Sequence, residues 1–217
     1  MWSACTNRHQ ADSPFRFSDL LKLQDEWLEK LRPNQESALL FAELAPTVTL
    51  GARQVYDPET RARFQALGDV EIVSGERGGN ETWHGPGQWV GFVLTPLEKF
   101  TGDAKGVRKS VYKILQNVGR VAKKYVGETH LEDGNRLGLW SNQGKLVSVG
   151  IKVRAGYVTS GFAINCIPNP QAFLGINPCG IDQAKPDFLF RESISISEWS
   201  QEFMKIPSQI TESFITS

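Results

Sequence analysis

The sequence predicts one α+β domain over residues 1–217, in which a mixed β-sheet packs against helices. Apolar residues recur at the three- and four-residue spacing of amphipathic helices in 17–31 and 105–125. Short β-prone runs lie between and beyond these segments, and no internal repeat or linker divides them. With 217 residues and 40% hydrophobic side chains, the chain is large enough to bury a sizeable core.

The helix predicted at 17–31 has one apolar face, on which Gln24 is the polar exception, and Ser18 is its candidate N-cap. Three β-prone runs follow it, at 36–44, 46–53 and 69–75. A glycine-rich stretch comes next, and the segment 87–97 then predicts a further strand that Pro96 ends.

The helix predicted at 105–125 has one apolar stripe and an opposite face that is basic. The basic residues are Lys105, Arg108, Lys109, Lys113, Arg120, Lys123 and Lys124. Such a face is either a solvated helix surface or a docking surface for an acidic partner.

The segment 136–166 predicts three consecutive strands, with turns at 141–144 and 154–156. The next segment, 167–188, is too rich in proline and glycine for a regular element, and the tail at 196–214 predicts short helical pieces.

The composition excludes several classes of protein. Lys plus Arg equals Asp plus Glu, at 24 each, so the chain lacks the overall charge of a dedicated nucleic-acid binder. The N-terminal 17 residues hold no apolar run of signal-peptide length, and no run elsewhere approaches the roughly 20 apolar residues that cross a bilayer. We therefore expect a cytoplasmic protein with neither a nucleic-acid nor a membrane partner.

The three cysteines cannot all pair, and their spacing fits neither a zinc site nor a C-x-x-C redox motif: they are Cys5, Cys166 and Cys179. The sequence "PCG" is typical of a tight turn that exposes the Cys179 side chain, whereas Cys166 ends an apolar strand and is most simply a core residue. A thiol with a free pKa of ~8.5 needs a base or cation nearby to ionise at neutral pH. The candidates are His84 and Lys145, the latter otherwise a solvated turn residue.

The stretch 74–92, "SGERGGNETWHGPGQWVGF", is rich in glycine. Glycines let the backbone approach a ligand and present N–H groups to a carboxylate, phosphate or thioester oxygen, although they also mark ordinary turns. The stretch matches neither a P-loop nor a dinucleotide fingerprint. Within it, His84 is either a hydrogen-bonded interior imidazole or a site residue, and His9 and His130 lie in unrelated segments, which disfavours a metal site.

Four motifs in this order, "RGGNETWHGPGQWVGF", "GKLVSVGIKV", "GFAIN" and "INPCG", resemble the lipoyl (octanoyl) transferase family, also called lipoate-protein ligase B. The resemblance covers roughly residues 47–190. It implies the fold of the catalytic domain of biotin and lipoate protein ligases. It also implies transfer of an octanoyl group from octanoyl-acyl carrier protein to a lysine of a lipoyl domain of 2-oxoacid dehydrogenase or glycine cleavage proteins, by a monomer without metal or cofactor.

The resemblance also implies the roles of individual residues. Cys179 would carry the acyl group as a thioester, and Lys145 would lower the pKa of that thiol and later help to deprotonate the incoming amine. The implied substrate contacts are Arg77, Gly78, Gly79, Asn80, Glu81, Thr82, Trp83, His84, Ser148, Val149, Gly150, Gly161, Phe162 and Ala163. We expect Trp83 and Phe162 to wall the acyl chain and His84 to line the reaction centre.

The chain departs from the family pattern at Ser160, where the family has a second histidine, and at Trp83, where a tyrosine is commoner. Three other interpretations remain: an ATP-dependent lipoate or biotin ligase on the same fold, a Cys-His hydrolase, and a module that binds acyl carrier protein or lipoyl domains without catalysis. The "PCG" cysteine favours the transferase over a ligase, which activates its acid as an adenylate.

Overall fold

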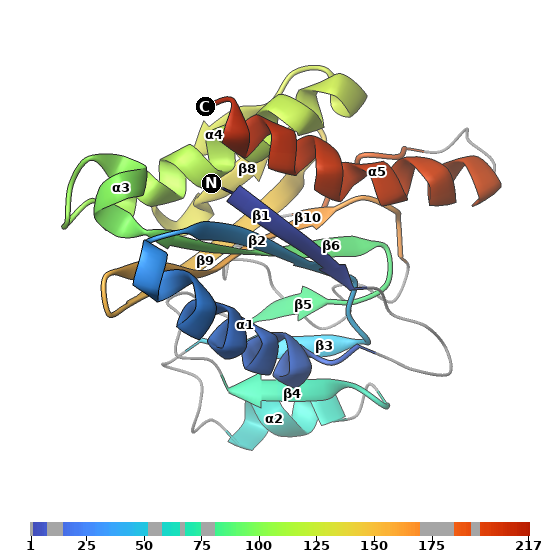
Figure 1. Ribbon diagram of the computed structural model, residues 1–217. Helices are drawn as coiled ribbons and strands as arrows, with labels where there is room; N and C mark the ends of the chain where they lie inside the picture. Colours follow the sequence, from blue (N-terminus) through green and yellow to red (C-terminus); the bar gives the residue numbers. More distant parts are fainter. Residues whose placement is uncertain are drawn as a thin grey trace.

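The computed structural model of the protein describes residues 2–7, 15–51, 58–65, 68–74, 81–169, 185–191 and 196–217. These residues form a seven-stranded mixed sheet, a separate three-stranded sheet and the helices that cover them (Figure 1). This arrangement confirms the predicted α+β class.

The large sheet is antiparallel except at one edge. Its strands are, in spatial order, β1 (Trp2–Asn7), β2 (Ser37–Ala42), β6 (Gln88–Pro96), β10 (Tyr157–Asn165), β9 (Lys145–Arg154), β8 (Gly138–Trp140) and β7 (His130–Glu132). The pair of β1 and β2 is parallel, and every other neighbouring pair is antiparallel. The sequence predicted the central strands and missed the two at the edges.

The small sheet lies below the large one in Figure 1 and comes from the segment around the glycine-rich stretch. Its order is β4 (Glu71–Ser74), β3 (Thr47–Leu50) and β5 (Thr82–His84). The strand β5 was not predicted, because three residues within a glycine-rich run carry too little pattern to identify.

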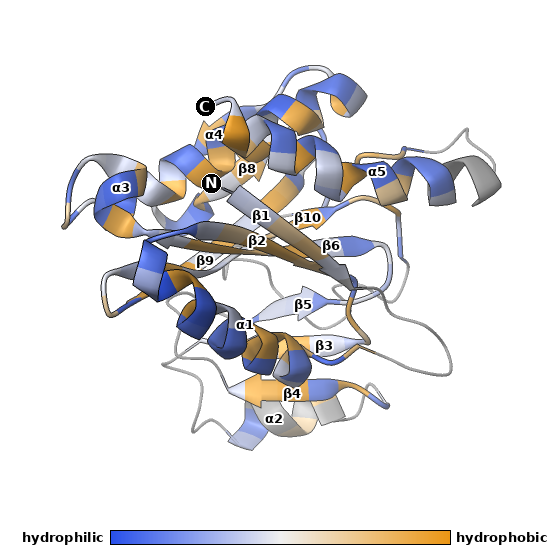
Figure 2. Ribbon diagram, viewed as in Figure 1, coloured by the Kyte–Doolittle hydropathy of each residue, from blue (hydrophilic) through white to orange (hydrophobic). Residues whose placement is uncertain are grey.

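Helices cover both faces of the large sheet (Figure 1). The helices of the protein are α1 (Phe17–Leu31), α2 (Pro58–Gln65), α3 (Leu97–Thr101), α4 (Val107–Val126) and α5 (Ile196–Ile215), with 3-10 turns at Arg32–Asn34 and Gly134–Arg136. Of these, α2 packs against the small sheet. One hydrophobic cluster fills the space between the sheet and α4 with α5, and a second lies between the sheet and α1. Figure 2 shows the polar outer side of α1 beside the apolar central strands. Among the described helices, none is long and apolar enough to cross a membrane.

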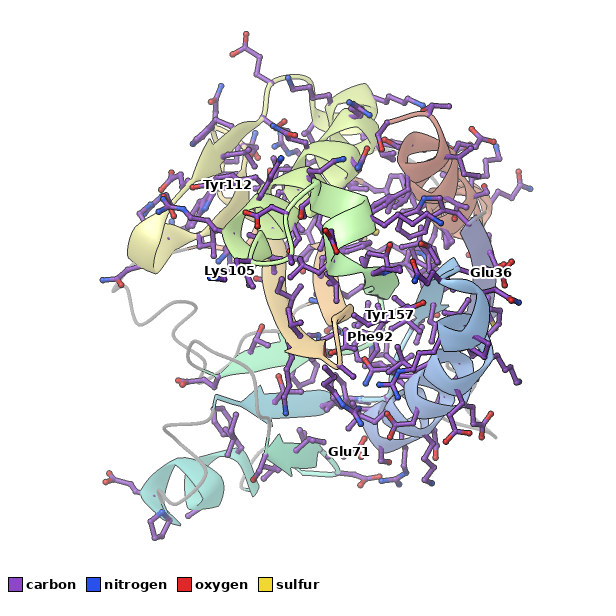
Figure 3. All side chains as sticks on the ribbon, turned by 60° about the vertical axis from the view of Figure 1, so that its left-hand side comes forward. Glu36, Glu71, Phe92, Lys105, Tyr112 and Tyr157 are labelled. Carbon is purple, nitrogen blue, oxygen red and sulfur yellow. The ribbon has the colours of Figure 1, made fainter. Side chains whose placement is uncertain are left out.

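The N-terminus of α1 is capped by a residue from the small sheet. The prediction of a Ser18 cap is wrong: the N-cap position is Arg16, whose side chain makes no cap hydrogen bond. Instead the carboxylate of Glu71 accepts the main-chain N–H of Phe17 at 2.9 Å and that of Ser18 at 3.4 Å. Figure 3 labels Glu71 in this place. A carboxylate is favoured there because the helix dipole is positive at that end.

The C-terminal end of α1 is tied to the large sheet. The Tyr157 hydroxyl, on β10, lies 3.2 Å from the carbonyl oxygen of Leu31 and 3.3 Å from that of Glu36. Tyr157 is labelled near the turn after α1 in Figure 3. Helix α1 is therefore held at both ends by contacts that are distant in sequence.

The prediction of short helical pieces in the tail is wrong, because α5 continues through Pro207. A proline inside a helix cannot donate a hydrogen bond to the carbonyl four residues earlier. That carbonyl, of Phe203, instead accepts the indole N–H of Trp89 at 2.8 Å, and the two rings stack with centroids 4.7 Å apart. The sheet thus satisfies the group that the proline leaves unpaired.

We predict that Glu71→Gln lowers the free energy of unfolding by about 1 kcal/mol, because a neutral amide interacts less favourably with the two N–H groups and with the helix dipole. Chemical denaturation measures the effect. The matched control is Glu29→Gln, on the exposed side of α1, which removes the same charge. Equal stabilities of the two variants would contradict the capping role.

Candidate functional site

Lys145 opens β9 and is buried, with 6% of its surface exposed, so it is not a solvated turn residue. Its Nζ donates to the carbonyl of Leu137 at 2.9 Å and lies 5.6 Å from the ring centroid of Trp140. Its side chain runs over Gly138, where a Cβ would come within 2.6 Å of the lysine Cε. Glycine at 138 therefore leaves the room in which the lysine lies.

The main chain of Lys145 is hydrogen-bonded to a segment that follows Cys179, the predicted nucleophile. Its N–H donates to the carbonyl of Lys185 at 2.9 Å, and its own carbonyl accepts the N–H of Asp187 at 3.0 Å. Pro186 lies between them in a parallel bridge with Lys145. Residues 185–187 are thereby fixed beside Lys145.

Asp187 fastens the same segment to the turn before β9. Its buried carboxylate accepts the hydroxyl of Ser141 and forms an ion pair with Arg191. The Ser141 oxygen in turn accepts the main-chain N–H groups of Gln143 and Gly144, at 3.0 and 3.3 Å. This carboxylate therefore joins two segments that meet at Lys145.

Five predicted site residues lie outside the described residues: Arg77, Gly78, Gly79, Asn80 and Cys179. Cys179 is six residues before Lys185, and six residues of extended chain reach about 20 Å. The position of Lys185 is therefore compatible with the predicted contact between Cys179 and Lys145. Their contact stays a prediction.

His84 ends β5 and is 6% exposed. Its Nδ1 lies 2.8 Å from Oε1 of Gln88, and its Nε2 lies 3.5 Å from the hydroxyl of Thr49. Its ring stacks on Phe17 with centroids 5.7 Å apart. These contacts favour the interior imidazole among the alternatives that the sequence left open.

The two other residues of β5 and the residue before them are also enclosed. Trp83 is 4% exposed and packs with Val48, Leu50 and Phe64 around the small sheet. Glu81 is buried as well, and Thr82 is half-buried.

The six predicted contacts on β9 and β10 divide between the two faces of the large sheet. Ser148 pairs with Ala163, and Gly150 with Gly161, so these four residues share one face. Ala163 belongs to the cluster under α1, which identifies that face. On this face, which lies on the side of α1 and the small sheet, Gly161 and Ala163 are buried and Ser148 and Gly150 are half-buried.

Val149 and Phe162 face the opposite way, toward α4 and α5. The Phe162 ring lies over Gly91, where a Cβ would come within 2.3 Å of it. Phe162 points to the α4 and α5 side of the large sheet, whereas Trp83 packs within the small sheet on the other side. The two side chains belong to different clusters and do not form one wall. The expectation of a shared wall for the acyl chain is therefore corrected.

Ser160 has a left-handed backbone, with φ of +60°, in the middle of β10. Its N–H donates to the side-chain oxygen of Gln24 at 2.8 Å. The next residue, Gly161, lies so close to β6 that a Cβ would come within 2.0 Å of the Gly91 oxygen. The kink lies at the position where the resemblance placed a histidine.

Several polar residues that organise this region were not predicted from the sequence: Gln24, Gln88, Asn165 and Asp187. Gln24 gave a signal, because it is a polar residue on an apolar helix face. Gln88 and Asn165 lie inside the quoted motifs "HGPGQ" and "GFAIN". Both line a small pocket whose other lining residues are Trp83, Pro86, Gly87, Ile167, Asn169 and Phe188.

Cys166 is fully buried, and burial raises the pKa of its thiol far above the ordinary value. Its Sγ lies 3.6 Å from the carbonyl oxygen of Ile164. The expected core role of Cys166 is confirmed. Cys5 lies half-buried on β1.

Comparison with known proteins identifies relatives over most of the chain. Residues 17–205 match the model of the family described as lipoyl protein ligase A/B catalytic domain. An octanoyltransferase of Desulforamulus reducens is 32% identical over 170 residues, which are 76% of this chain and 72% of the relative. An octanoyltransferase of Citrifermentans bemidjiense is 34% identical over 169 residues, 76% of each chain.

Solved structures show the same fold at low sequence identity. Protein Ta0514 of T. acidophilum with bound lipoic acid has a TM-score of 0.70 at 13% identity and covers 98% of this chain and 87% of its own. A lipoate-protein ligase A bound with ATP has a TM-score of 0.62 at 12% identity, with 88% and 79% coverage. A biotin protein ligase of Leishmania major in complex with biotin has a TM-score of 0.51 at 12% identity. The match covers 99% of this chain and 71% of that structure. The predicted ligase-like fold is confirmed.

We predict that Cys166 resists iodoacetamide at pH 8 in the folded protein and reacts once the protein is unfolded in urea, because the thiol is buried and protonated. Peptide mass spectrometry measures the modification of each cysteine. Cys166→Ala provides the control, since it should leave the extent of native labelling unchanged. Alkylation of Cys166 at equal rates in folded and unfolded protein would contradict its burial.

Proposed function

The chain belongs to the lipoyl protein ligase A/B catalytic domain family, and from this membership we propose that it is an octanoyltransferase of lipoate biosynthesis. The proposal rests on identities of 32% and 34% to octanoyltransferases over about three quarters of the chain. Residues 1–217 would act as one monomeric catalytic domain. The donor is octanoyl-acyl carrier protein, and the acceptor is a lysine of a lipoyl domain.

The similarity to an ATP-bound ligase concerns the fold alone, at 12% identity. A ligase activates a free acid as an adenylate and needs no cysteine nucleophile. The "PCG" motif around Cys179 therefore supports the transferase over the ATP-dependent alternative.

In the first proposed step, the Cys179 thiolate attacks the thioester carbonyl of the donor. A new sulfur–carbon bond forms, the bond to the carrier's thiol breaks, and the Lys145 ammonium gives its proton to the departing thiolate. In the second step, the acceptor amine attacks the acyl-enzyme and an amide forms. Neutral Lys145 takes the amine proton, and Cys179 leaves as a thiolate.

The contacts of Lys145 support this role. Its Nζ is held by the Leu137 carbonyl, and its main chain by the segment that follows Cys179. A fixed cation beside a thiol favours the thiolate, which is the nucleophilic form.

We assign the acyl chain to the face of β9 and β10 that carries small side chains. Gly150, Gly161 and Ala163 have little or no side chain there, with Ser148 beside them. The six methylenes of an octanoyl group contribute about 5 kcal/mol of binding, at ~0.8 kcal/mol each, when they leave water. Residues 77–80, outside the described part, would contact the thioester end with their main chain.

The basic face of α4 is the proposed docking surface for acidic acyl carrier protein. No acidic residue lies within Val107–Val126, and Lys109, Lys123 and Lys124 are exposed. Lys113 differs from these three lysines, because its Nζ donates to the Phe100 carbonyl at 3.0 Å. Opposite charges on partner and helix accelerate encounter and are screened by salt.

We predict that the protein incubated with octanoyl-acyl carrier protein gains the mass of one octanoyl group, released by hydroxylamine as a thioester is. Intact mass spectrometry measures the adduct. Cys179→Ser should abolish it, whereas the matched change Cys166→Ser should leave it. A folded wild-type protein that binds the carrier without any adduct would instead be a binding module.

We predict that Lys109→Glu combined with Lys124→Glu raises KM for octanoyl-acyl carrier protein at least five-fold at low salt, with kcat changed less than two-fold. The effect should shrink as ionic strength rises. Steady-state kinetics at two salt concentrations measure it. The control pair Lys22→Glu and Lys30→Glu changes the net charge equally on α1, and an equal rise of KM there would discard the docking surface.

A further inference from the structure

A continuous polar chain crosses the interior from the small sheet to β9. The Thr49 hydroxyl lies 3.5 Å from Nε2 of His84, whose Nδ1 lies 2.8 Å from Oε1 of Gln88. Nε2 of Gln88 lies 2.9 Å from Oδ1 of Asn165. Nδ2 of Asn165 lies 3.1 Å from the main-chain oxygen of Lys145. The four side chains are at most 7% exposed, so these hydrogen bonds lie inside the protein.

The main-chain oxygen of Lys145 fixes the direction of every bond in this chain. A carbonyl oxygen only accepts, so Asn165 must turn its NH₂ group toward Lys145 and its oxygen toward Gln88. Gln88 must then donate to that oxygen, which leaves its own oxygen to accept from His84. Neutral His84 therefore carries its proton on Nδ1 and a lone pair on Nε2.

The reverse direction would bury acceptors against each other. If the Gln88 amide were turned, its oxygen would face the oxygen of Asn165. If both amides were turned, the oxygen of Asn165 would face that of Lys145. Buried polar groups without a partner carry a desolvation penalty, so the backbone oxygen selects one arrangement. Gln88 has a second reason to keep it, because its Nε2 also lies 3.3 Å from the carbonyl oxygen of Trp83.

The Asn165 bond reaches Lys145 from a different side than its other main-chain bonds do. The N–H of Lys145 donates to Lys185, and its carbonyl accepts from Asp187; both partners follow Cys179 in the sequence. The bond from Asn165 comes from β10, within the large sheet. A side chain follows the orientation of its main chain, so this bond helps to set where the lysine Nζ lies.

We propose that Gln88 and Asn165 are positioning residues for acyl transfer: with His84 as their outer donor, they hold the main chain of Lys145 against the sheet. His84 acts through this chain as a hydrogen-bond donor, rather than as an acid or base on the substrate. The effect on rate rests on the proposed function. The direction of the hydrogen bonds and the tautomer of His84 do not depend on the proposed function.

The first test is the tautomer of His84 in the wild-type protein. Long-range ¹H–¹⁵N correlation spectra with labelled histidine, at pH 8, report which ring nitrogen carries the proton, and His84→Asn identifies the signal. We expect the proton on Nδ1, whereas free neutral histidine prefers Nε2. A proton on Nε2 would overturn the proposed direction.

The second test is the rate of transfer. Asn165→Asp keeps the shape, replaces the N–H donor to Lys145 with an acceptor oxygen and adds a negative charge. We expect kcat to fall at least ten-fold, with KM for octanoyl-acyl carrier protein within two-fold. Asn142→Asp, the same change on the exposed turn before β9, is the control. Equal kcat values in the two variants would overturn the role of Asn165.

The third test separates positioning from acid-base chemistry at His84. The Nδ2 of His84→Asn can replace the imidazole Nδ1–H, whereas His84→Leu has no donor. We expect the asparagine variant to be at least ten-fold faster than the leucine variant. Equal loss in both would overturn the positioning role.

These outcomes distinguish failure of the inference from failure of the proposed function. Thermal unfolding first establishes which variants are folded. If Asn165→Asp does not fold, the tautomer of His84 and the comparison of His84→Asn with His84→Leu still test the proposal. A wild-type protein without an octanoyl adduct would refute the proposed function, and the spectrum would still test the direction of the chain.

Discussion

Three hydrogen bonds converge on the main chain of Lys145, and they join segments that are far apart in the sequence. Its N–H bonds to Lys185, and its carbonyl bonds to Asp187 and Asn165. A buried main-chain group that loses its partner costs about as much as a lost hydrogen bond, so none of the three segments can shift alone. The start of β9, the end of β10 and residues 185–187 therefore hold one another in place. The rest of the candidate site depends on this junction.

Strand alternation places the larger hydrophobic cluster and the proposed acyl surface on opposite faces of the large sheet. On β10, Phe162 faces α4 and α5 and fills the space above Gly91, whereas Gly161 and Ala163 face α1 and the small sheet. A single strand thus carries a large residue that faces one side of the sheet between two small buried residues that face the other. Ser160 adds a local kink whose N–H is satisfied by Gln24, so the sheet tolerates an irregular backbone next to this surface.

Local periodicity was sufficient to predict α1, α4 and the central strands, but neither the unbroken helix α5 nor the contacts between elements. Helix α1 begins and ends at the predicted residues because its apolar spacing is regular over fifteen positions. Its cap could not be predicted, since Glu71 lies 54 residues from Phe17 and nothing local to either marks the pair. The same holds for the polar chain: the sequence motifs contain Gln88 and Asn165, but only the pairing of β6 with β10 brings them together. The burial of Lys145 was not predicted, because a lysine after a glycine-containing turn is usually solvated. The faces to which Val149 and Phe162 point are set by strand register.

The proline of α5 is connected to the same polar chain through two consecutive residues of β6. Gln88 turns to one face of the sheet, toward His84 and Asn165, and Trp89 turns to the other, toward Phe203. The carbonyl that Pro207 leaves without a helical partner is the one that Trp89 binds, so the helix interruption creates the acceptor for this contact. Because both side chains extend from adjacent positions of one strand, a shift of β6 that loosened α5 would also separate Gln88 from Asn165. The packing of the C-terminal helix and the orientation of Lys145 are therefore constrained by the same short stretch of backbone.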